Sequence, residues 1–238
     1  MATLKQWLRK RRIKKQSPKM GSLKVGPVSR DKTYAEKLRA AFPREQRAGI
    51  DAVISILVND RPRSYYLDDK IATLPALNLS GSVVRIPYRI YLPEPDGGLV
   101  ETLTPDQRVF LSCIYTRHFD GYIRERHLRW LLENTVDPVI VPFVVQLMGE
   151  YVSEICEVVA NWPSDIPIAN YLAFAEENPA FITLTCQHAM SYWAVFYGRR
   201  YRFIEMPPLL AMSRLGIWDH RIGKRKLRRG GPANARVD

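Results

Sequence analysis

Apolar side chains recur with helical spacing over most of residues 33–212. They repeat every three to four positions, which is the spacing of one face of an α-helix. The first such segment carries its apolar stripe over residues 48–57 and is interrupted near Pro43. Thr33 and Glu36 have the spacing of a capping box, so we expect this segment to begin at Thr33 and to run to about Asn59.

Strong helix start signals follow in the middle of the chain. Thr104 is followed by Pro105 and, two residues later, by Gln107, an order typical of a helix N-terminus. The pattern predicts a helix from there to about Arg117. A turn at residues 118–121 then leads into a second helix over about residues 122–133.

The most apolar segment predicts the centre of the core. Residues 142–162 are apolar on nearly all sides, and a helix of that kind is buried between its neighbours. A short helix over residues 168–176 and a long one from Asn178 to Gly198 are expected next, with Gly198 as a left-handed cap. His188 falls on the apolar stripe of the long helix and is interpreted as a core histidine.

One segment has a β-like pattern. Residues 82–92 alternate in part between apolar and polar positions, but Pro87 removes a backbone donor. We expect an edge hairpin or an extended arm there. The fold class is therefore all-α, or mostly α: packed antiparallel helices in one domain of residues 33–212, with this small arm.

Positive charge is concentrated in the two terminal segments. Residues 1–32 carry eleven Lys and Arg against one Asp, and residues 213–238 carry eight against two. The whole chain has a net charge of +12, so the remainder is slightly acidic, at −4. Blocks of this kind are typical of basic tails that contact polyanions, and both are expected to be disordered.

Cysteine content and hydropathy indicate the compartment. The three cysteines, an odd number without a CxxC pair, are expected to be reduced and buried, which favours the cytoplasm. The apolar run from Pro138 to Gly149 is twelve residues, shorter than the roughly 20 that a membrane span needs. No transmembrane segment is expected.

Two resemblances can be stated on particular residues. A helix, a turn at Asp120-Gly121, an arginine-bearing helix and an apolar helix, over about residues 104–160, resemble HEAT-type α-helical repeats, which implies stacked antiparallel helix pairs. No second copy is found at a period of roughly 40 residues. Residues 103–197 also look like bacterial proteins of unknown function, through YTRHFDGYIRER (115–126), QLMGEYV (146–152) and SYW (191–193). Neither resemblance implies an activity.

One polar cluster could carry chemistry. His118 and Asp120 could form an acid–base pair, with the nearby arginines holding an anion. The structural alternative is that Asp120 caps the second helix. Glu150 lies in the most apolar segment, where a carboxylate needs a partner; an ion pair with Arg117 or Arg124 is favoured over catalysis. These three residues are the catalytic candidates.

Cofactor and metal signals are weak. The chain lacks HExxH, paired ExxH and CxxC motifs, a glycine-rich phosphate loop and a GxSxG motif, so no metal or cofactor is expected. The sequence favours a non-catalytic protein over an enzyme.

The basic residues point instead to an anionic partner. Residues 197–203 interleave aromatic rings with arginines, a pairing that can stack on bases while contacting phosphate; the rings could equally pack against the core. We expect a helical interaction module that contacts an anionic polymer, most simply nucleic acid. The candidate contacts are Lys10, Arg11, Arg12, Lys14, Lys15, Arg199, Arg200, Arg202, Lys224, Arg225, Lys226, Arg228 and Arg229.

Other partners remain open from the sequence. The first 15 residues place Leu4, Trp7 and Leu8 on one helical face among cations, which could lie on an anionic membrane surface or serve as a targeting segment. A protein partner is the third alternative, and the enzyme with a site around residues 117–127 and Glu150 is the fourth.

Overall fold

The computed structural model describes residues 30–59 and 72–218. The described chain is mostly helical, with a single small hairpin, so the predicted fold class is confirmed. Its helices are α2 (Arg30–Arg39), α3 (Arg47–Asn59), α4 (Gly97–Glu101), α5 (Pro105–Tyr115), α6 (Gly121–Asn134), α7 (Val141–Met148), α8 (Ser153–Ala160), α9 (Ile168–Glu177), α10 (Pro179–Tyr192) and α11 (Pro207–Arg214). Short 3-10 turns are η1 (Arg44–Gln46), η3 (Pro138–Ile140) and η5 (Phe203–Glu205), and η4 (Trp193–Tyr197) is a π-helical turn.

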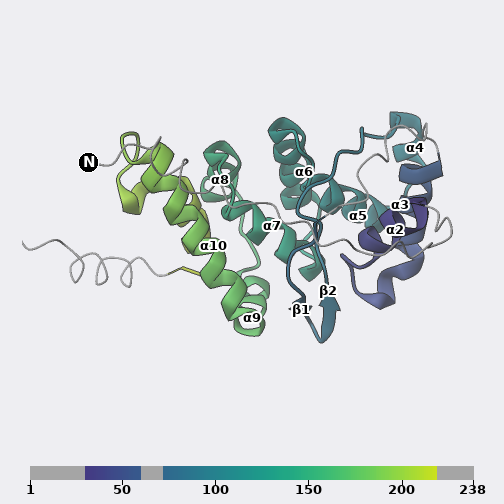
Figure 1. Ribbon diagram of the computed structural model, residues 1–238, viewed down its shortest axis with the longest axis horizontal. Coiled ribbons are helices and arrows are strands. Elements are labelled where there is room, and N and C mark those ends of the chain that lie inside the picture. The colour runs from purple at the N-terminus through teal and green to yellow at the C-terminus, as the bar shows by residue number, and fades with distance from the viewer. Residues whose placement is uncertain (1–29, 60–71, 219–238) are drawn as a thin grey trace, which may run out of the picture.

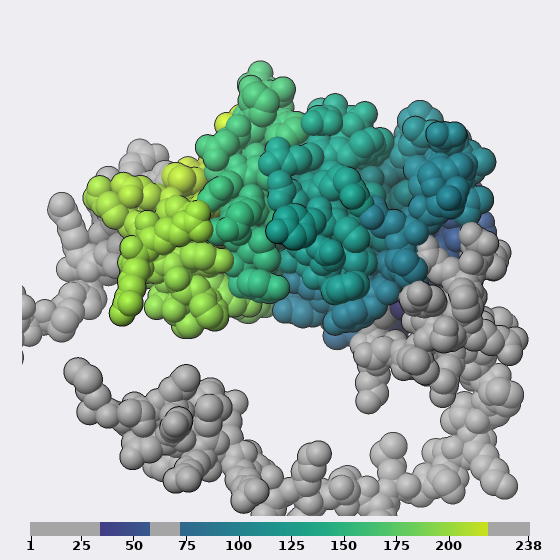
Figure 2. All heavy atoms as spheres, turned by 90° about the horizontal axis from the view of Figure 1, so that it is seen from above, coloured from purple at the N-terminus to yellow at the C-terminus, as the bar shows by residue number. Residues whose placement is uncertain are grey.

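The helices follow one another along an elongated body. Figure 1 shows α2, α3 and α4 at one end, α5 to α8 across the middle, and α9 and α10 at the other end. Figure 2, seen from above, shows the same progression of colour along the long axis. Neighbours in the chain pack on one another, as α5 does on α6 and α10 does on α9, while α11 returns to pack against α8.

Two predicted helix starts are confirmed, and one is wrong. Thr104 accepts from the backbone N–H of Gln107, whose side chain bonds back to the Thr104 N–H. Asp120 likewise caps α6 by accepting from the N–H of Tyr122. The capping box predicted at Thr33 does not start a helix, because α2 begins at Arg30 and Thr33 lies inside that helix.

The central apolar helix predicted over residues 142–162 is broken in two. The prediction of burial is confirmed, since every residue of α7 is buried, but α7 ends at Met148 and α8 begins only at Ser153. At the break, a Cβ on Gly149 would lie 3.3 Å from Cγ2 of Thr185. Gly149 thus allows α10 to approach closely, and the turn redirects Glu150 away from the helical path.

Two details of α10 were predicted incorrectly. The helix ends at Tyr192 and passes into the π-helical turn, and Gly198 has φ −60°, so it is not a left-handed cap. His188 is exposed, because the buried stripe is rotated by one position and consists of Phe181, Thr185, Cys186 and Ala189.

A small hairpin is present, but it begins before the predicted arm of residues 82–92, whose first three residues form its second strand and whose remainder is an extended segment. Strands β1 (Leu77–Leu79) and β2 (Ser82–Val84) pair antiparallel, with Leu77 opposite Val84. Ser80 and Gly81 both have positive φ, as a two-residue turn of this kind requires. The hairpin is held at its base by Asn178, whose side chain bonds the backbone N–H and C=O of Asn78, both at 2.8 Å.

The folded chain continues past residue 212. Helix α11 begins at Pro207, its residues Leu209 and Met212 are buried, and Leu215 beyond it is fully buried. All three cysteines are free and buried, as expected. Within residues 30–59 and 72–218, no helix has the length and apolar character needed to cross a membrane.

Candidate functional site

Three arginines surround one buried carboxylate. Arg89 forms a two-pronged pair with Glu150, at 2.7 Å on each carboxylate oxygen. Nη2 of Arg117 lies 2.5 Å from Oε1, and Nε of Arg124 lies 3.2 Å from Oε2. The side chains of Arg117 and Arg124 are completely buried, so this is an interior ionic cluster rather than a surface one.

Separate segments supply the four side chains. Arg89 lies in the extended segment after β2, Arg117 follows the end of α5, Arg124 lies in α6, and Glu150 lies in the break between α7 and α8. Arg117 also donates to the backbone carbonyls of residues 87 and 88, and Arg124 to those of residues 118 and 119. The arginines therefore fasten two loops to the helical core.

The cluster has a surplus of positive charge. Three guanidinium groups face one carboxylate, which leaves +2 if all are ionised. Burial alone raises the pKa of Glu150, but Arg117, Arg89 and Arg124 outweigh it and hold that pKa below its ordinary value. Burial lowers the pKa of Arg117 and Arg124, but arginine stays protonated in proteins. Among the described residues, buried Nε and Nη2 of Arg124 have no hydrogen-bond partner, so Nε contacts Glu150 as an ion pair only.

These contacts restrict what Glu150 can do chemically. Both of its oxygens accept from arginine and its pKa is lowered, so it is a poor proton carrier at neutral pH. The ion pair predicted with Arg117 or Arg124 is confirmed for both. Sequence reasoning missed Arg89, which makes the best-formed contact.

His118 and Asp120 lie beside the cluster but are otherwise engaged. Nδ1 of His118 accepts from the backbone N–H of Asp120 at 3.1 Å, while the Asp120 carboxylate caps α6. Burial is the main cause of the lowered pKa of His118. The structural interpretation of Asp120 as a cap is thus confirmed, and its carboxylate makes no described bond to the His118 ring.

A second polar network was not expected from the sequence. Nε2 of His127 lies 2.9 Å from Glu94, and Nδ1 lies 3.2 Å from Oγ of Ser112. Ser–His–Glu is a set that can generate a nucleophile. Ser112, however, is buried within α5 at 4% exposure, so a substrate cannot reach its hydroxyl. We interpret the network as a structural tie between α5, α6 and Glu94.

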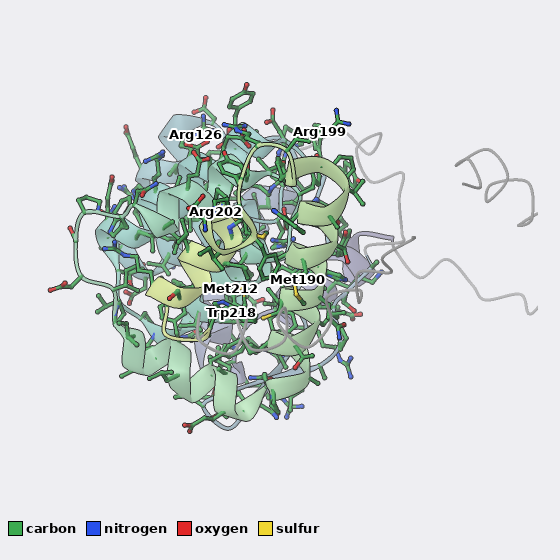
Figure 3. The ribbon with its side chains drawn as sticks, turned by 90° about the vertical axis from the view of Figure 1, so that its left-hand side faces the viewer. Arg126, Met190, Arg199, Arg202, Met212 and Trp218 are labelled. Atoms are coloured by element: carbon green, nitrogen blue, oxygen red, sulfur yellow. The ribbon has the colours of Figure 1, made fainter. Side chains whose placement is uncertain are left out.

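The described basic residues at the α10 end are exposed. Figure 3 looks onto this end and labels Arg199 and Arg202 there. Arg200 lies 4.9 Å from the ring centroid of Tyr201, and Arg202 pairs with Glu205 at 3.2 Å. Tyr201 and Phe203 pack against a small apolar cluster, so for these two rings the packing alternative is confirmed.

A second arginine cluster lies at the opposite end of the body. A cavity of about 390 Å³ between α2, α3 and the hairpin is lined by Glu36 and four arginines: Arg39, Arg44, Arg47 and Arg85. Arg39 pairs with Asp51 at 2.5 Å. The other three are exposed and have no side-chain partner among the described residues. A backbone bond from residue 85 to the residue 40 carbonyl joins the two segments.

The remaining predicted contacts lie outside the described residues. These are Lys10, Arg11, Arg12, Lys14 and Lys15 in the first segment, and Lys224, Arg225, Lys226, Arg228 and Arg229 in the last.

Within residues 30–59 and 72–218, no group of three or more His, Cys, Asp or Glu side chains could hold a metal ion. Comparison with protein-family models, with curated proteins and with solved structures gives no significant match.

Proposed function

We propose that this protein is a non-catalytic helical module that binds an anionic polymer, most simply nucleic acid, through its basic terminal segments. The observation that carries the proposal is the division of charge in the sequence: the two termini hold a large cationic surplus, and the intervening chain is slightly acidic. Solubility alone does not require positive charge to be concentrated at the two ends of a slightly acidic chain. Polyanions are the partners that such segments attract.

Exposed arginines of the folded body support binding to the same kind of partner. The cavity at the α2 end has three exposed arginines without a described side-chain partner, and the α10 end has Arg199, Arg200 and Arg202. A long flexible polyanion could contact both ends of an elongated body, whereas a small anion could contact only one. The HEAT-like stacking of helix pairs belongs to this proposal, as does a cytoplasmic location, where the buried thiols would stay reduced.

Affinity in this scheme comes from phosphate neutralisation. Each phosphate contact releases a counterion, so the logarithm of the binding constant falls linearly with the logarithm of salt concentration, with a slope of about −0.7 per contact for a single strand. Ten terminal cations in contact with phosphate would therefore contribute a slope of about −7. Sequence preference should be small.

The test compares full-length chains in which charge alone is changed. One variant replaces Lys10, Arg11, Arg12, Lys14 and Lys15 with Gln; a second does the same to Lys224, Arg225, Lys226, Arg228 and Arg229. Binding of a labelled oligonucleotide is followed by fluorescence anisotropy across a salt series. Each variant should bind more weakly and with a shallower salt slope than the wild type.

A matched control changes exposed arginines elsewhere. Arg126→Gln with Arg129→Gln removes two cations from the outer face of α6, where Arg126 is paired with Glu94 and Arg129 with Glu125. This variant should keep most of the salt slope. Terminal variants that bind with wild-type affinity and slope, or a wild type that binds no oligonucleotide, would refute the proposal.

A further inference from the structure

Aromatic rings are exposed around the Glu150 cluster. Tyr88, Tyr91, Phe119, Tyr151 and Phe196 are between 46% and 65% exposed, and Tyr192 is half-buried among them. We call these six residues the aromatic face. Large exposed apolar groups are common singly, but a contiguous group of them marks an interaction site.

Two parts of the aromatic face can be traced by contact. Ile90 exchanges backbone bonds with residues 117 and 119, which brings Tyr91 over Phe119 with a centroid separation of 5.4 Å. In the second part, Tyr151 lies 6.3 Å from Tyr192, which in turn lies 6.3 Å from Phe196 in the π-helical turn. Turns of this type often occur at functional sites.

Arg89 connects Tyr88, the remaining ring, and the second part to the buried charge. Its guanidinium lies 5.4 Å from the ring centroid of Tyr88 and binds Glu150, the residue directly before Tyr151. The cluster, with its +2 surplus, therefore adjoins Tyr88 and Tyr151, and Arg124 of the same cluster donates to the backbone carbonyl of Phe119. Charge in a poorly solvated interior acts over a longer range than charge in water, so the aromatic face should attract anions.

Exposed rings above positive charge fit one kind of polymer. In a duplex the base faces are stacked on one another and only base edges and phosphates are presented, so exposed aromatic rings would have no base face to stack on. An unpaired strand offers base faces and phosphates together, and aromatic stacking with cationic contacts is how many proteins hold such strands. We propose that the aromatic face binds single-stranded nucleic acid by stacking its bases.

This inference rests on the proposed function. It adds the class of nucleic acid, a single strand, and the surface that would bind its bases. The terminal segments would hold any polyanion, whereas stacking on the aromatic face requires bases. An abasic strand, which keeps the phosphates and lacks the bases, separates the two contributions. The tails should hold it through its phosphates, but it cannot stack on the aromatic face.

The experiment uses the full-length chain and three labelled probes: an oligothymidylate of about 20 nucleotides, an abasic strand of equal length, and a duplex of equal length. Anisotropy titrations are made at the highest salt at which binding is measurable, because salt screens the tails more than it weakens stacking. The variants are the double substitution Tyr91→Ala with Phe119→Ala, and the single substitution Phe196→Ala. Circular dichroism first checks that each keeps its helical content.

Tyr122→Ala is the matched control. Tyr122 is the most exposed aromatic residue described, at 85%, but it lines a cavity on the outer face of α6 with Glu125 and Arg129. Its loss removes the same kind of ring from a surface outside the aromatic face. The control should bind all three probes as the wild type does.

The expected result is selective. The wild type should prefer oligothymidylate to the abasic strand, and both ring variants should lose about tenfold in affinity for oligothymidylate with an unchanged salt slope. Equal binding of the abasic strand and oligothymidylate by the wild type, or ring variants that bind like the wild type, would overturn the inference and leave the proposed function standing. Equal losses for all probes would also overturn it. Absence of binding to every probe would refute both.

Discussion

Glu150→Gln should destabilise the fold strongly, although it changes shape very little. The substitution removes the one negative charge among three guanidinium groups, two of which are completely buried. Breaking a buried ion pair from one side costs about 3–5 kcal/mol, because the remaining charge stays buried without compensation. For a chain of this size, each kcal/mol lowers Tm by about 2–4 °C, so a fall of about 6–20 °C is expected.

The free energy of unfolding is measured by urea titration, with the helical circular dichroism signal as the readout. Glu125→Gln is the control, since Glu125 pairs with Arg129 at 2.8 Å on the surface, where such a pair contributes less than about 1 kcal/mol. If Glu150→Gln unfolds within about 1 kcal/mol of the wild type, the cluster does not hold the two loops as argued above.

The contribution of Glu150 to folding stability should depend on pH, and the direction of this dependence follows from its lowered pKa. The arginines hold the pKa of Glu150 below its ordinary value of 4.5, so the ionised form favours the folded state. Its contribution is fully present above pH 4.5 and is lost as the pH falls through the folded pKa. The stability difference between wild type and Glu150→Gln should therefore be largest near neutral pH and shrink in acid. A difference that stayed constant from pH 7 into acid would contradict this assignment.

Two further predictions concern single backbone positions. Gly216→Ala should destabilise the fold by about 1–3 kcal/mol in urea titration, because Gly216 has φ +76° and an added Cβ would lie 2.7 Å from Cγ2 of Ile168; Gly97→Ala, with open space around it, should not, and equal effects would contradict the reasoning. Thr104→Ala should cost about 0.5–2 kcal/mol through loss of the α5 cap, whereas Thr183→Ala on the exposed side of α10 should be near neutral in the same assay.

Local signals predicted much of the fold. Thr104 and Asp120 were identified as caps because the groups that form a cap lie within a few residues of one another. The break at Gly149 could not be predicted in this way, because the residues on both sides remain apolar and the stop depends on close approach of Thr185. The domain boundary expected at residue 212 falls inside α11, which begins at Pro207, because proline is favoured at the first position of a helix.

The candidate site was predicted only in part. An ionic partner for Glu150 was expected on physical grounds, since a carboxylate in an apolar segment requires one, and Arg117 and Arg124 were correctly named. Arg89 lies 61 residues away in a segment without helical period, so no spacing rule connects it to Glu150. The arginine cavity was missed for the same reason, because Arg85 reaches Arg44 and Arg47 only through the fold.

The bond between Asn78 and Asn178 bears on the order in which the chain can fold during synthesis. The two residues are 100 positions apart, so the base of the hairpin has no partner while the ribosome is still making the intervening helices. Helices α5 and α6 can pair as soon as both have emerged, because their contacts are local. The hairpin must wait until α9 has left the exit tunnel. Its strands are short, three residues each, which limits the edge that an unfinished chain exposes to its neighbours.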